Sequence, residues 1–584
     1  MHMRFIIACA VGIGFFTGPS FAIAPTDQPQ PEAQFLVVAP RAEVASAGAV
    51  YLTDGGNAVD AVIAMAWAMC VLEPQVASVG GEAIMLYYDQ ASKVVTSYDG
   101  LARAPAVTPT LDRMRHEPVD GRWHQSSLGG ASVGTPGFVK VLSDIHKTHG
   151  SVDWRRLVNP AIAMAMRGVP MGRRLNQALA HAPFVGHDRR VRAKFFGADH
   201  KPRHQDEILT SPELAQTLYR LGTDGSSYLY AGALGRRIVD TVRGPDWQPG
   251  GLLDDDISGY RVRVTDAVCM ASGMHNVCTT PQPTAGVSLL QSLAIATVAD
   301  SGKSTHQSAE ASRLALSDFR RWVFDYQAAG LKRIDLLARP YIASRAELIL
   351  DTAGNGTQTA GRPPGSMDIE VDAPLVLPDH HWASILAMDA EGNVALLTMG
   401  LGGNFGSNLY VDGFFLNSAV SRLASGYEPW AKKPLNVVAP HRRPASLVAP
   451  LVVKDIESGA FRYALGGGAS LSETLIVLQH AMRGGDDIST AVQKPRVVAR
   501  HSHLEVEADG PAGMLEDRGH EIVVRESHGR LLGIAMEGGE PVSILDERTI
   551  ACSLNETQVS YGECPRDEVL GLCIDAEHWS QCKE

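Results

Sequence analysis

The order of apolar and polar residues predicts a buried helix and two hairpins. Residues 58–74 read AVDAVIAMAWAMCVLEP, with apolar residues on more than one face, and the preceding Asp54-Gly55-Gly56-Asn57 supplies a turn and a cap. Residues 79–100 read VGGEAIMLYYDQASKVVTSYDG, two apolar strands around a polar turn. Residues 380–394 read HHWASILAMDAEGNV, a strand that ends in the polar turn Glu391-Gly392-Asn393 and is expected to lead into a second strand.

Longer helical runs alternate with these strands. Residues 151–265 are expected to be mainly helical, and Gly129 to Gly137 form a glycine-rich loop before another helix. That loop lacks the GKS or GKT ending of a phosphate-binding P-loop, so it gives little support for nucleotide binding. Residues 351–379 are polar and rich in Pro and Gly, as in a loop or linker. Hairpins and long helices in separate runs predict an α+β protein with stacked layers and largely antiparallel pairing.

The amino-acid composition argues against nucleic acid as a binding partner. A chain of 584 residues with 45% hydrophobic and 20% charged residues can bury a large core. The formal net charge of -12 argues against a surface that neutralises phosphates, since such a surface needs clustered Lys and Arg. We therefore expect no nucleic-acid partner.

The N-terminus predicts export. Residues 1–22 contain one Arg, an apolar run from Phe5 to Phe16 and small residues before Ala22, as in a secretory signal peptide. The alternative is a membrane anchor, but the run is shorter than the roughly 20 residues that a spanning helix needs. No later segment is long and apolar enough to span a bilayer. We expect a periplasmic or secreted protein with no stable membrane span after cleavage.

The cysteines fit an oxidising compartment. Cys70 lies in the apolar helical pattern and is expected to be a buried free thiol, whereas Cys269 and Cys278 lie on the arms of a strand-turn-strand pattern that can bring the sulfurs together. The tail, residues 549–584, has little core of its own and holds four more: Cys552, Cys564, Cys573 and Cys582. Two disulfides in the tail are expected, with three connectivities possible; the alternative zinc site lacks a CxxC pair.

Six blocks of the sequence resemble successive blocks of the gamma-glutamyltransferase family. They occur in the family's order between about residue 36 and residue 548. The blocks are GGNAVDAVIAMAWAMCVLEPQVASVGGEAIMLYYD, TPGFVKVLSDIHKTHGSVDWRRLVNPAIAMAMRG, TTPQPTAGVSLLQSLAI, AEGNVALLTMGLGGNFGS, HRRPASLVAP and GGGASLSETLIVLQ.

The resemblance implies a four-layer αββα N-terminal-nucleophile hydrolase sandwich with two stacked antiparallel sheets. Family members cut themselves before a threonine, whose own α-amino group then activates its hydroxyl. They transfer or hydrolyse γ-glutamyl groups of glutathione-like substrates. In this chain, the large-subunit-like region would span residues 36–381 and the small-subunit-like region residues 382–548 of the same domain.

The position of the family's nucleophile holds tryptophan. In the family the threonine stands eleven residues before the asparagine of the Asp-x-x-Gly-Asn turn, and counting back from Asn393 gives Trp382. An indole carries no nucleophile, and its N–H can only donate. We therefore predict a chain that stays uncut and is inactive or strongly altered in γ-glutamyl transfer.

Other family positions also differ. The supporting second threonine falls on Gly400, and the substrate-binding asparagine falls on Gly402. The arginine that holds the substrate's α-carboxylate falls on Leu101. The acidic residue that holds the α-amino group falls on Ser421 or Arg422, and a guanidinium there would repel an ammonium.

Some candidate substrate-binding residues remain. Ser446 follows Arg-Pro-Ala where the family has a serine pair. Arg103 would substitute for an arginine at Leu101 only with a shifted backbone. Gly467 and Gly468 would supply oxyanion N–H groups after a short shift of register, although a structural strand-to-helix turn is the alternative reading.

A relocated nucleophile is the alternative to loss of activity. Ser384 shares a strand face with Trp382, and a cut before it would create an N-terminal serine. His380 and His381 point to opposite faces, and the pair His501 and His503 has no third metal ligand in the sequence. The chain has no G-x-S-x-G elbow and no HExxH signature, so we expect neither a metal nor a cofactor.

Two hypotheses of different classes follow. The first is an active amidohydrolase that uses Ser384. The second is a non-catalytic relative that binds a small amino-acid or peptide-like ligand or a protein, with Trp382 and Arg422 reshaping the old pocket toward an anionic or aromatic ligand. Self-cleavage near residue 381 separates them.

Overall fold

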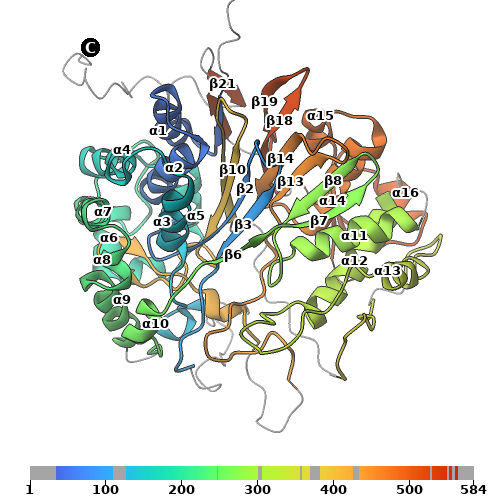
Figure 1. The fold of residues 1–584 in the computed structure, drawn as a ribbon. Helices are drawn as coiled ribbons and strands as arrows, with labels where there is room; N and C mark the ends of the chain where they lie inside the picture. Colours follow the sequence, from blue (N-terminus) through green and yellow to red (C-terminus); the bar gives the residue numbers. More distant parts are fainter. Residues whose placement is uncertain are drawn as a thin grey trace, which may run out of the picture. The chain divides into compact units, whose positions relative to one another are not determined.

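Two antiparallel β-sheets lie face to face between layers of helices (Figure 1). The computed structural model describes residues 35–108, 127–245, 248–299, 305–354, 358–368, 382–424, 433–500, 502–525 and 529–548, and the backbone of 551–554 and 559–562. All of them belong to the unit Gln34–Glu584. The predicted signal peptide, the side chain of Cys552 and the other three tail cysteines lie outside the described residues.

The larger sheet has eight strands, and every neighbouring pair is antiparallel. In spatial order they are β21 (Val559–Gly562), β20 (Ala551–Leu554), β1 (Leu36–Ala39), β9 (Trp382–Met388), β10 (Val394–Gly400), β2 (Glu82–Tyr88), β3 (Val95–Gly100) and β6 (Arg263–Asp266). Both hairpins expected from the sequence are present, as β2–β3 and as β9–β10.

The smaller sheet has six strands and is also antiparallel throughout. In spatial order they are β19 (Glu540–Leu545), β18 (Leu531–Glu537), β14 (Phe461–Gly467), β13 (Leu451–Asp455), β8 (His275–Thr279) and β7 (Val268–Ser272). Two further strand pairs are formed by β4 (Val169–Pro170) with β5 (Ile208–Leu209) and by β11 (Tyr410–Val411) with β12 (Phe414–Phe415). A three-stranded sheet contains β15 (Val497–Ala499), β16 (Leu504–Glu507) and β17 (Ile522–Arg525).

Strand alternation gives each sheet two buried faces. On β9, Leu386 and Met388 pack against the smaller sheet, whereas Ala383, Ile385 and Ala387 join the core under the helices. The inter-sheet core contains apolar residues from both sheets, among them Leu36, Leu86, Leu396, Val452, Ala464 and Ile534. The expected αββα arrangement is therefore confirmed.

Helices cover the outer face of each sheet (Figure 1). The larger sheet is covered by α1 (Ala42–Thr53), α2 (Ala58–Leu72), α3 (Phe138–His149), α4 (Trp154–Arg167), α7 (Pro212–Asp224), α8 (Ser227–Tyr230), α9 (Ala233–Arg243) and α10 (Asp254–Ser258). The smaller sheet is covered by α11 (Gly286–Val298), α12 (Thr305–Trp322), α13 (Arg339–Ala346), α14 (Leu471–Gln479) and α15 (Ile488–Gln493). The remaining helices are α5 (Arg173–Ala180), α6 (Arg189–Phe195) and α16 (Ala512–Glu516).

Two local predictions about α2 and the cysteines are confirmed. Every residue of α2 is buried, and the side chain of Asn57 caps it by accepting from two backbone N–H groups. Cys269 and Cys278 form a disulfide across β7 and β8. Cys70 is a free cysteine inside α2, and burial raises the pKa of its thiol, which keeps it protonated and unreactive.

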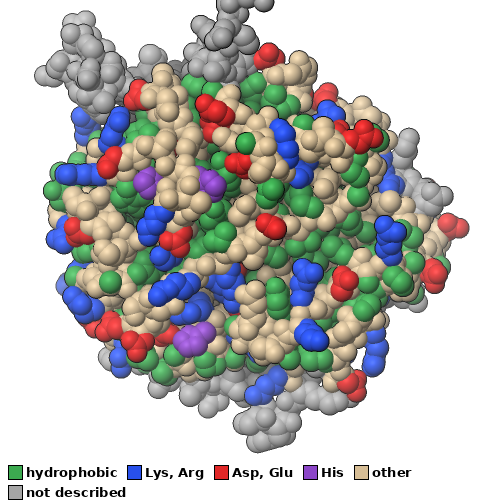
Figure 2. Space-filling view, in the orientation of Figure 1, with side chains coloured by type: hydrophobic (Ala, Val, Ile, Leu, Met, Phe, Trp, Pro, Cys, Tyr) green, Lys and Arg blue, Asp and Glu red, His purple; other side chains and the backbone are tan. Residues whose placement is uncertain are grey.

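Helix length and the grouping of possible metal ligands can be compared over the described part of the chain. There, no helix has the length and apolarity to cross a bilayer, and His, Cys, Asp and Glu side chains do not gather in metal-binding groups of three. Figure 2 shows acidic and basic side chains interspersed over one face.

Two buried histidines join α12 to the segment before β17. Nδ1 of His306 lies 2.7 Å from Nε2 of His520, and Nδ1 of His520 lies 3.4 Å from the Arg313 guanidinium. Because Arg313 can only donate, His520 carries its proton on Nε2 and donates to His306, whose other nitrogen donates to the Leu350 carbonyl. Glu310 also faces His520, at 3.9 Å. This chain of hydrogen bonds needs the His520 imidazole neutral, because its Nδ1 must accept from Arg313.

Protein stability should therefore fall on acidification in a window set by His520. Burial and the charge of Arg313 lower the pKa of His520 to about 4, from 6.5. Below pH 6.5 the unfolded chain binds a proton that the folded chain does not, until the pH reaches the folded pKa. We expect this group to remove about 1–3 kcal/mol from the free energy of unfolding between these two pH values.

A His520→Gln variant isolates this contribution, since an amide can accept from Arg313 and donate to His306 without titrating. Denaturant unfolding of both proteins between pH 7 and pH 4 should show a steeper loss of stability in the wild type. Parallel pH profiles would contradict the assignment.

Candidate functional site

A cavity of about 520 Å³ opens at the end of the sandwich where β9 begins. Four elements form its walls: the start of β9, the glycine turn after β14, the segment that leads into β18, and one face of α5. The lining residues are Pro40, Gln75, Val76, Arg174, Gln177, Ala178, His181, Trp382, Ala383, Ser384, Asn404, Gly467, Gly468, Gly529, Arg530 and Leu532. Four of the sequence candidates, Trp382, Ser384, Gly467 and Gly468, thus meet here.

Trp382 fills the wall of the cavity at the first position of β9. Its cross-strand partner on β10 is Gly400, which leaves space beside the indole. The ring packs against an apolar cluster that includes Leu101. The guanidinium carbon of Arg422 lies 5.6 Å from the centre of the ring, within range of a cation–π contact. The indole therefore lies between an apolar cluster and a cation.

Arg422 is neutralised inside the protein. Its Nη2 lies 2.6 Å from Oε1 of Glu82, and the two side chains are 3% and 0% exposed. Glu82 also accepts from the backbone N–H of Ala102 at 2.9 Å. The charge of Arg422 is therefore directed at a carboxylate of its own chain. Sequence reasoning missed Glu82, although a single acid within the apolar run VGGEAIMLYY was a visible signal.

Ser384 lies in the cavity wall next to a second hydroxyl group. Its Oγ is 2.8 Å from Oγ1 of Thr398, its cross-strand partner on β10. Gly466 faces it closely, because a Cβ at that glycine would lie 2.6 Å from Oγ of Ser384. The serine is 1% exposed. Its described hydrogen-bond partner is thus a neutral hydroxyl, and no carboxylate lines the described wall of the cavity.

The glycine turn after β14 is shaped by its neighbour strand. Gly467 has a φ of +136°, a conformation that side chains disfavour, and it pairs with Leu531 on β18. The N–H of Gly468 donates to the carbonyl of Arg530 at 3.0 Å. That N–H is already used within the fold, so an oxyanion would have to displace this bond to receive it.

Two sequence candidates lie away from the lining of the cavity. Ser446 is buried, and its hydroxyl accepts from Arg422 at 3.4 Å. Arg103 donates to the backbone carbonyl of Asp256 at 3.2 Å and lies over the Tyr260 ring, 5.8 Å from its centre. Burial lowers the pKa of Arg103. The structure therefore does not place Arg103 as a replacement for the arginine lost at Leu101.

Histidine candidates fall largely outside the described residues. This is so for His380, His381 and His501. The histidine at the cavity is instead His181, which follows α5 and whose Nδ1 lies 2.8 Å from the carbonyl oxygen of Gln177.

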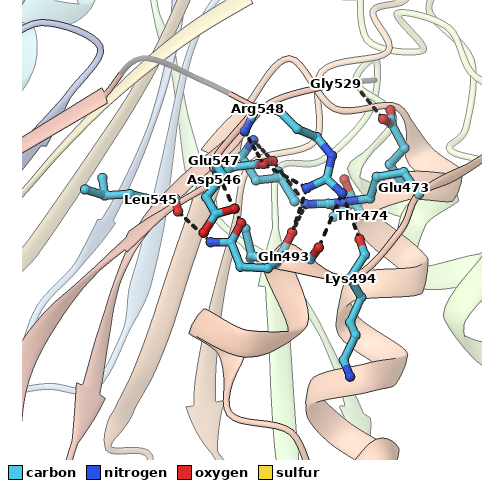
Figure 3. A network of polar contacts seen from close by, with 12 residues as sticks. Glu473, Thr474, Gln493, Lys494, Gly529, Leu545, Asp546, Glu547 and Arg548 are labelled. Carbon is cyan, nitrogen blue, oxygen red and sulfur yellow. Dashed lines mark hydrogen bonds and ion pairs between the residues drawn. The ribbon is translucent and has the colours of Figure 1, made fainter. Parts of the chain in front are cut away.

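A buried polar network holds the wall formed by residues 529–532 (Figure 3). Glu473 accepts from the N–H of Gly529 at 2.6 Å and from the N–H of Ser470 at 2.7 Å. Asp546 accepts from the N–H of Leu531 at 3.1 Å and pairs with the fully buried Arg496 at 3.0 Å. Two carboxylates thus fix the backbone on either side of Arg530.

Two stacked antiparallel sheets between helix layers, with a cavity at the start of a central strand, define an N-terminal-nucleophile hydrolase fold. The same fold occurs in the crystal structure of a cephalosporin acylase from Bacillus halodurans, which has a TM-score of 0.76 at 21% identity and covers 92% of this chain and 99% of that chain. A family model described as gamma-glutamyltranspeptidase matches residues 44–553. The chain belongs to this family.

Curated relatives at similar distance agree with this assignment. A glutathione hydrolase proenzyme of Bacillus subtilis (strain 168) is 26% identical over 471 residues, which cover 77% of this chain and 78% of that protein. Glutathione hydrolase 7 of Homo sapiens is 27% identical over 542 residues, which cover 88% of this chain and 78% of that protein.

Proposed function

We propose that this chain is an exported, uncut member of the gamma-glutamyltranspeptidase family that binds a small ligand in its cavity and does not transfer γ-glutamyl groups at a useful rate. The observation that carries the proposal is that the indole of Trp382 lines the cavity. The family resemblance aligns this residue with the family's nucleophile. Residues 36–381 and 382–548 then remain one polypeptide. Export rests on the signal peptide predicted for residues 1–22, and the tail cysteines would be paired in the same compartment.

The chemistry of the family supports this proposal. Self-cleavage and acyl transfer both need a hydroxyl or thiol at the first residue of the small subunit, activated by the new α-amino group. Trp382 supplies neither group. The site that would hold a glutamyl substrate is changed as well, since Leu101 is apolar and Arg422 is paired with Glu82.

The intact mass of the purified exported protein tests the proposal. We expect a single chain that lacks residues 1–22 and has free thiol only at Cys70, because the other retained cysteines would be bonded. A Trp382→Thr variant provides the comparison, as it restores the family's hydroxyl. Two fragments in the wild type, with a new N-terminus near residue 382, would overturn the proposal.

A relocated nucleophile is the second candidate function, and one observation favours it. Ser384 lies in the cavity wall, and its hydroxyl is 2.8 Å from that of the buried Thr398 and faces Gly466. A cut before Ser384 would give that serine an α-amino group as its base. A Ser384→Ala variant separates the two candidates, because it abolishes any fragments that depend on this serine and leaves an uncut chain unchanged.

A further inference from the structure

The cavity has a positive lining in an acidic protein. The chain has a formal net charge of -12, yet the ionisable residues in the described lining are Arg174, His181 and Arg530, with no Asp or Glu. Arg174 and His181 lie one helical turn either side of Gln177 and Ala178, so a single face of α5 presents them. Arg530 comes from the segment that leads into β18, next to the glycine turn.

The two guanidinium groups differ in how far they are neutralised. Nε of Arg174 lies 3.7 Å from Oε2 of Glu73, a carboxylate that is 1% exposed and sits behind the lining. Arg530 has no hydrogen bond or ion pair to another described side chain. Burial and the charge of Arg174 lower the pKa of Arg530, and the charges of Glu73 and Asp546 act in the opposite direction, so the two guanidinium groups and Glu73 act on one another. About one positive charge is therefore available at the mouth of the cavity.

The other lining residues indicate the size of the ligand and the polarity of its remaining groups. Pro40, Val76, Ala178, Trp382 and Leu532 give the cavity apolar walls, and its volume of about 520 Å³ suits a molecule of dipeptide size. A free ammonium would meet cationic side chains and no carboxylate in the described lining. An acylated nitrogen avoids this repulsion.

We propose that Arg174 and Arg530 form a carboxylate-binding site for a small N-acylated amino acid or peptide whose apolar body lies against Trp382. This inference rests on the proposed function, because it takes the cavity to be a binding site in the uncut chain. It differs from γ-glutamyl recognition in two respects: the guanidinium groups come from α5 and the segment before β18, and no α-ammonium is held.

A carboxylate matches the available charge better than a phosphate. Arg174 shares its charge with Glu73, and Arg530 supplies about one further unit, which balances a monoanion. A phosphate near pH 7 carries nearly two negative charges and is usually held by several guanidinium or backbone N–H groups. The N–H of Gly468 is already bonded to the Arg530 carbonyl.

Calorimetric titration at low salt tests the site with three matched probes. We expect N-acetyl-L-phenylalanine to bind, its neutral amide to bind at least about ten-fold more weakly, and L-phenylalanine to bind more weakly as well, since one loses the carboxylate and the other gains an ammonium. Inorganic phosphate serves as a fourth probe. Equal binding of acid and amide, or tighter binding of phosphate, would overturn the proposal.

Two variants test whether the carboxylate binds at Arg530. Arg530→Gln should weaken binding of N-acetyl-L-phenylalanine about ten-fold or more, because it removes a charge-assisted donor without leaving a buried charged partner. Arg362→Gln is the control, as its side chain is 79% exposed and lies outside the cavity lining. Equal losses in the two variants would count against the site.

The mass of the titrated protein shows whether the chain is cut, so it distinguishes failure of the carboxylate site from failure of the proposed function. An intact chain that binds none of the carboxylate probes overturns the carboxylate site and leaves the uncut chain in place. A cut chain overturns the proposed function, whatever the probes do.

Discussion

Replacement of Arg422 by methionine is expected to lower the free energy of unfolding by about 3–5 kcal/mol. The substitution keeps an apolar stem beside Trp382 but leaves the Glu82 carboxylate, which is 0% exposed, without its ion-pair partner. A single buried charge costs more than a surface pair because neither water nor a counter-charge stabilises it. Chemical denaturation at pH 7, followed by far-ultraviolet circular dichroism, measures the loss.

The double variant Glu82→Gln with Arg422→Met tests the cause. An amide at position 82 can still accept from the N–H of Ala102, so most of the stability should return when both charges are removed. Arg220→Met is the matched surface control: its pair with Asp224 is equally short, at 2.6 Å, but solvent-exposed, and no measurable change is expected. A double variant as unstable as the Arg422→Met single variant would contradict the ion-pair explanation.

The Arg422–Glu82 ion pair lies beside Trp382 in the fold. On β10, Gly400 lies opposite Trp382 on one side and opposite Glu82 on the other. The indole and the ion pair therefore occupy adjacent positions across three neighbouring strands. Restoring threonine at position 382 alone would leave this pair in place, so we expect Trp382→Thr to recover little γ-glutamyl transfer.

Sequence patterns were sufficient for the fold where local periodicity carried the information. The alternation along β9 predicted that Trp382 and Ser384 share a face, and both line the cavity. The apolar pattern of residues 58–74 predicted a buried helix, and α2 is buried throughout. The family blocks then predicted the stacked sheets, which local patterns alone could not order in space.

Long-range pairing could not be read from the sequence. Glu82 and Arg422 are 340 residues apart, and their contact joins the start of β2 to a short 3-10 helix, η5 (Ala419–Arg422). Arg174 and Arg530 likewise come from a helix and a loop segment that no motif connects. By the strand pattern, Arg103 could substitute for an arginine at Leu101 only with a shifted backbone; its backbone bridges to Thr135 and its side chain donates to the carbonyl of Asp256.

Replacement of Glu473 by alanine is expected to lower the free energy of unfolding by about 2–4 kcal/mol and to weaken ligand binding in the cavity. Its carboxylate is fully buried and accepts from two backbone N–H groups, one at the N-terminus of α14 and one at Gly529 (Figure 3). Without it, both donors lose a charge-assisted partner, and the segment that carries Arg530 loses an anchor. Denaturant unfolding and titration with N-acetyl-L-phenylalanine measure the two effects.

Asp487→Ala is the matched control for Glu473→Ala. Asp487 caps α15 by accepting from the N–H of Thr490 at 2.6 Å, but it has no bond to the cavity wall. Its loss should cost about 1 kcal/mol of stability, as for other helix caps, and leave affinity unchanged. If both variants, measured under conditions in which both are fully folded, lowered affinity equally, the bond from Glu473 to Gly529 would not be needed to shape the site. A selective loss in Glu473→Ala would instead tie the position of Arg530 to this buried carboxylate.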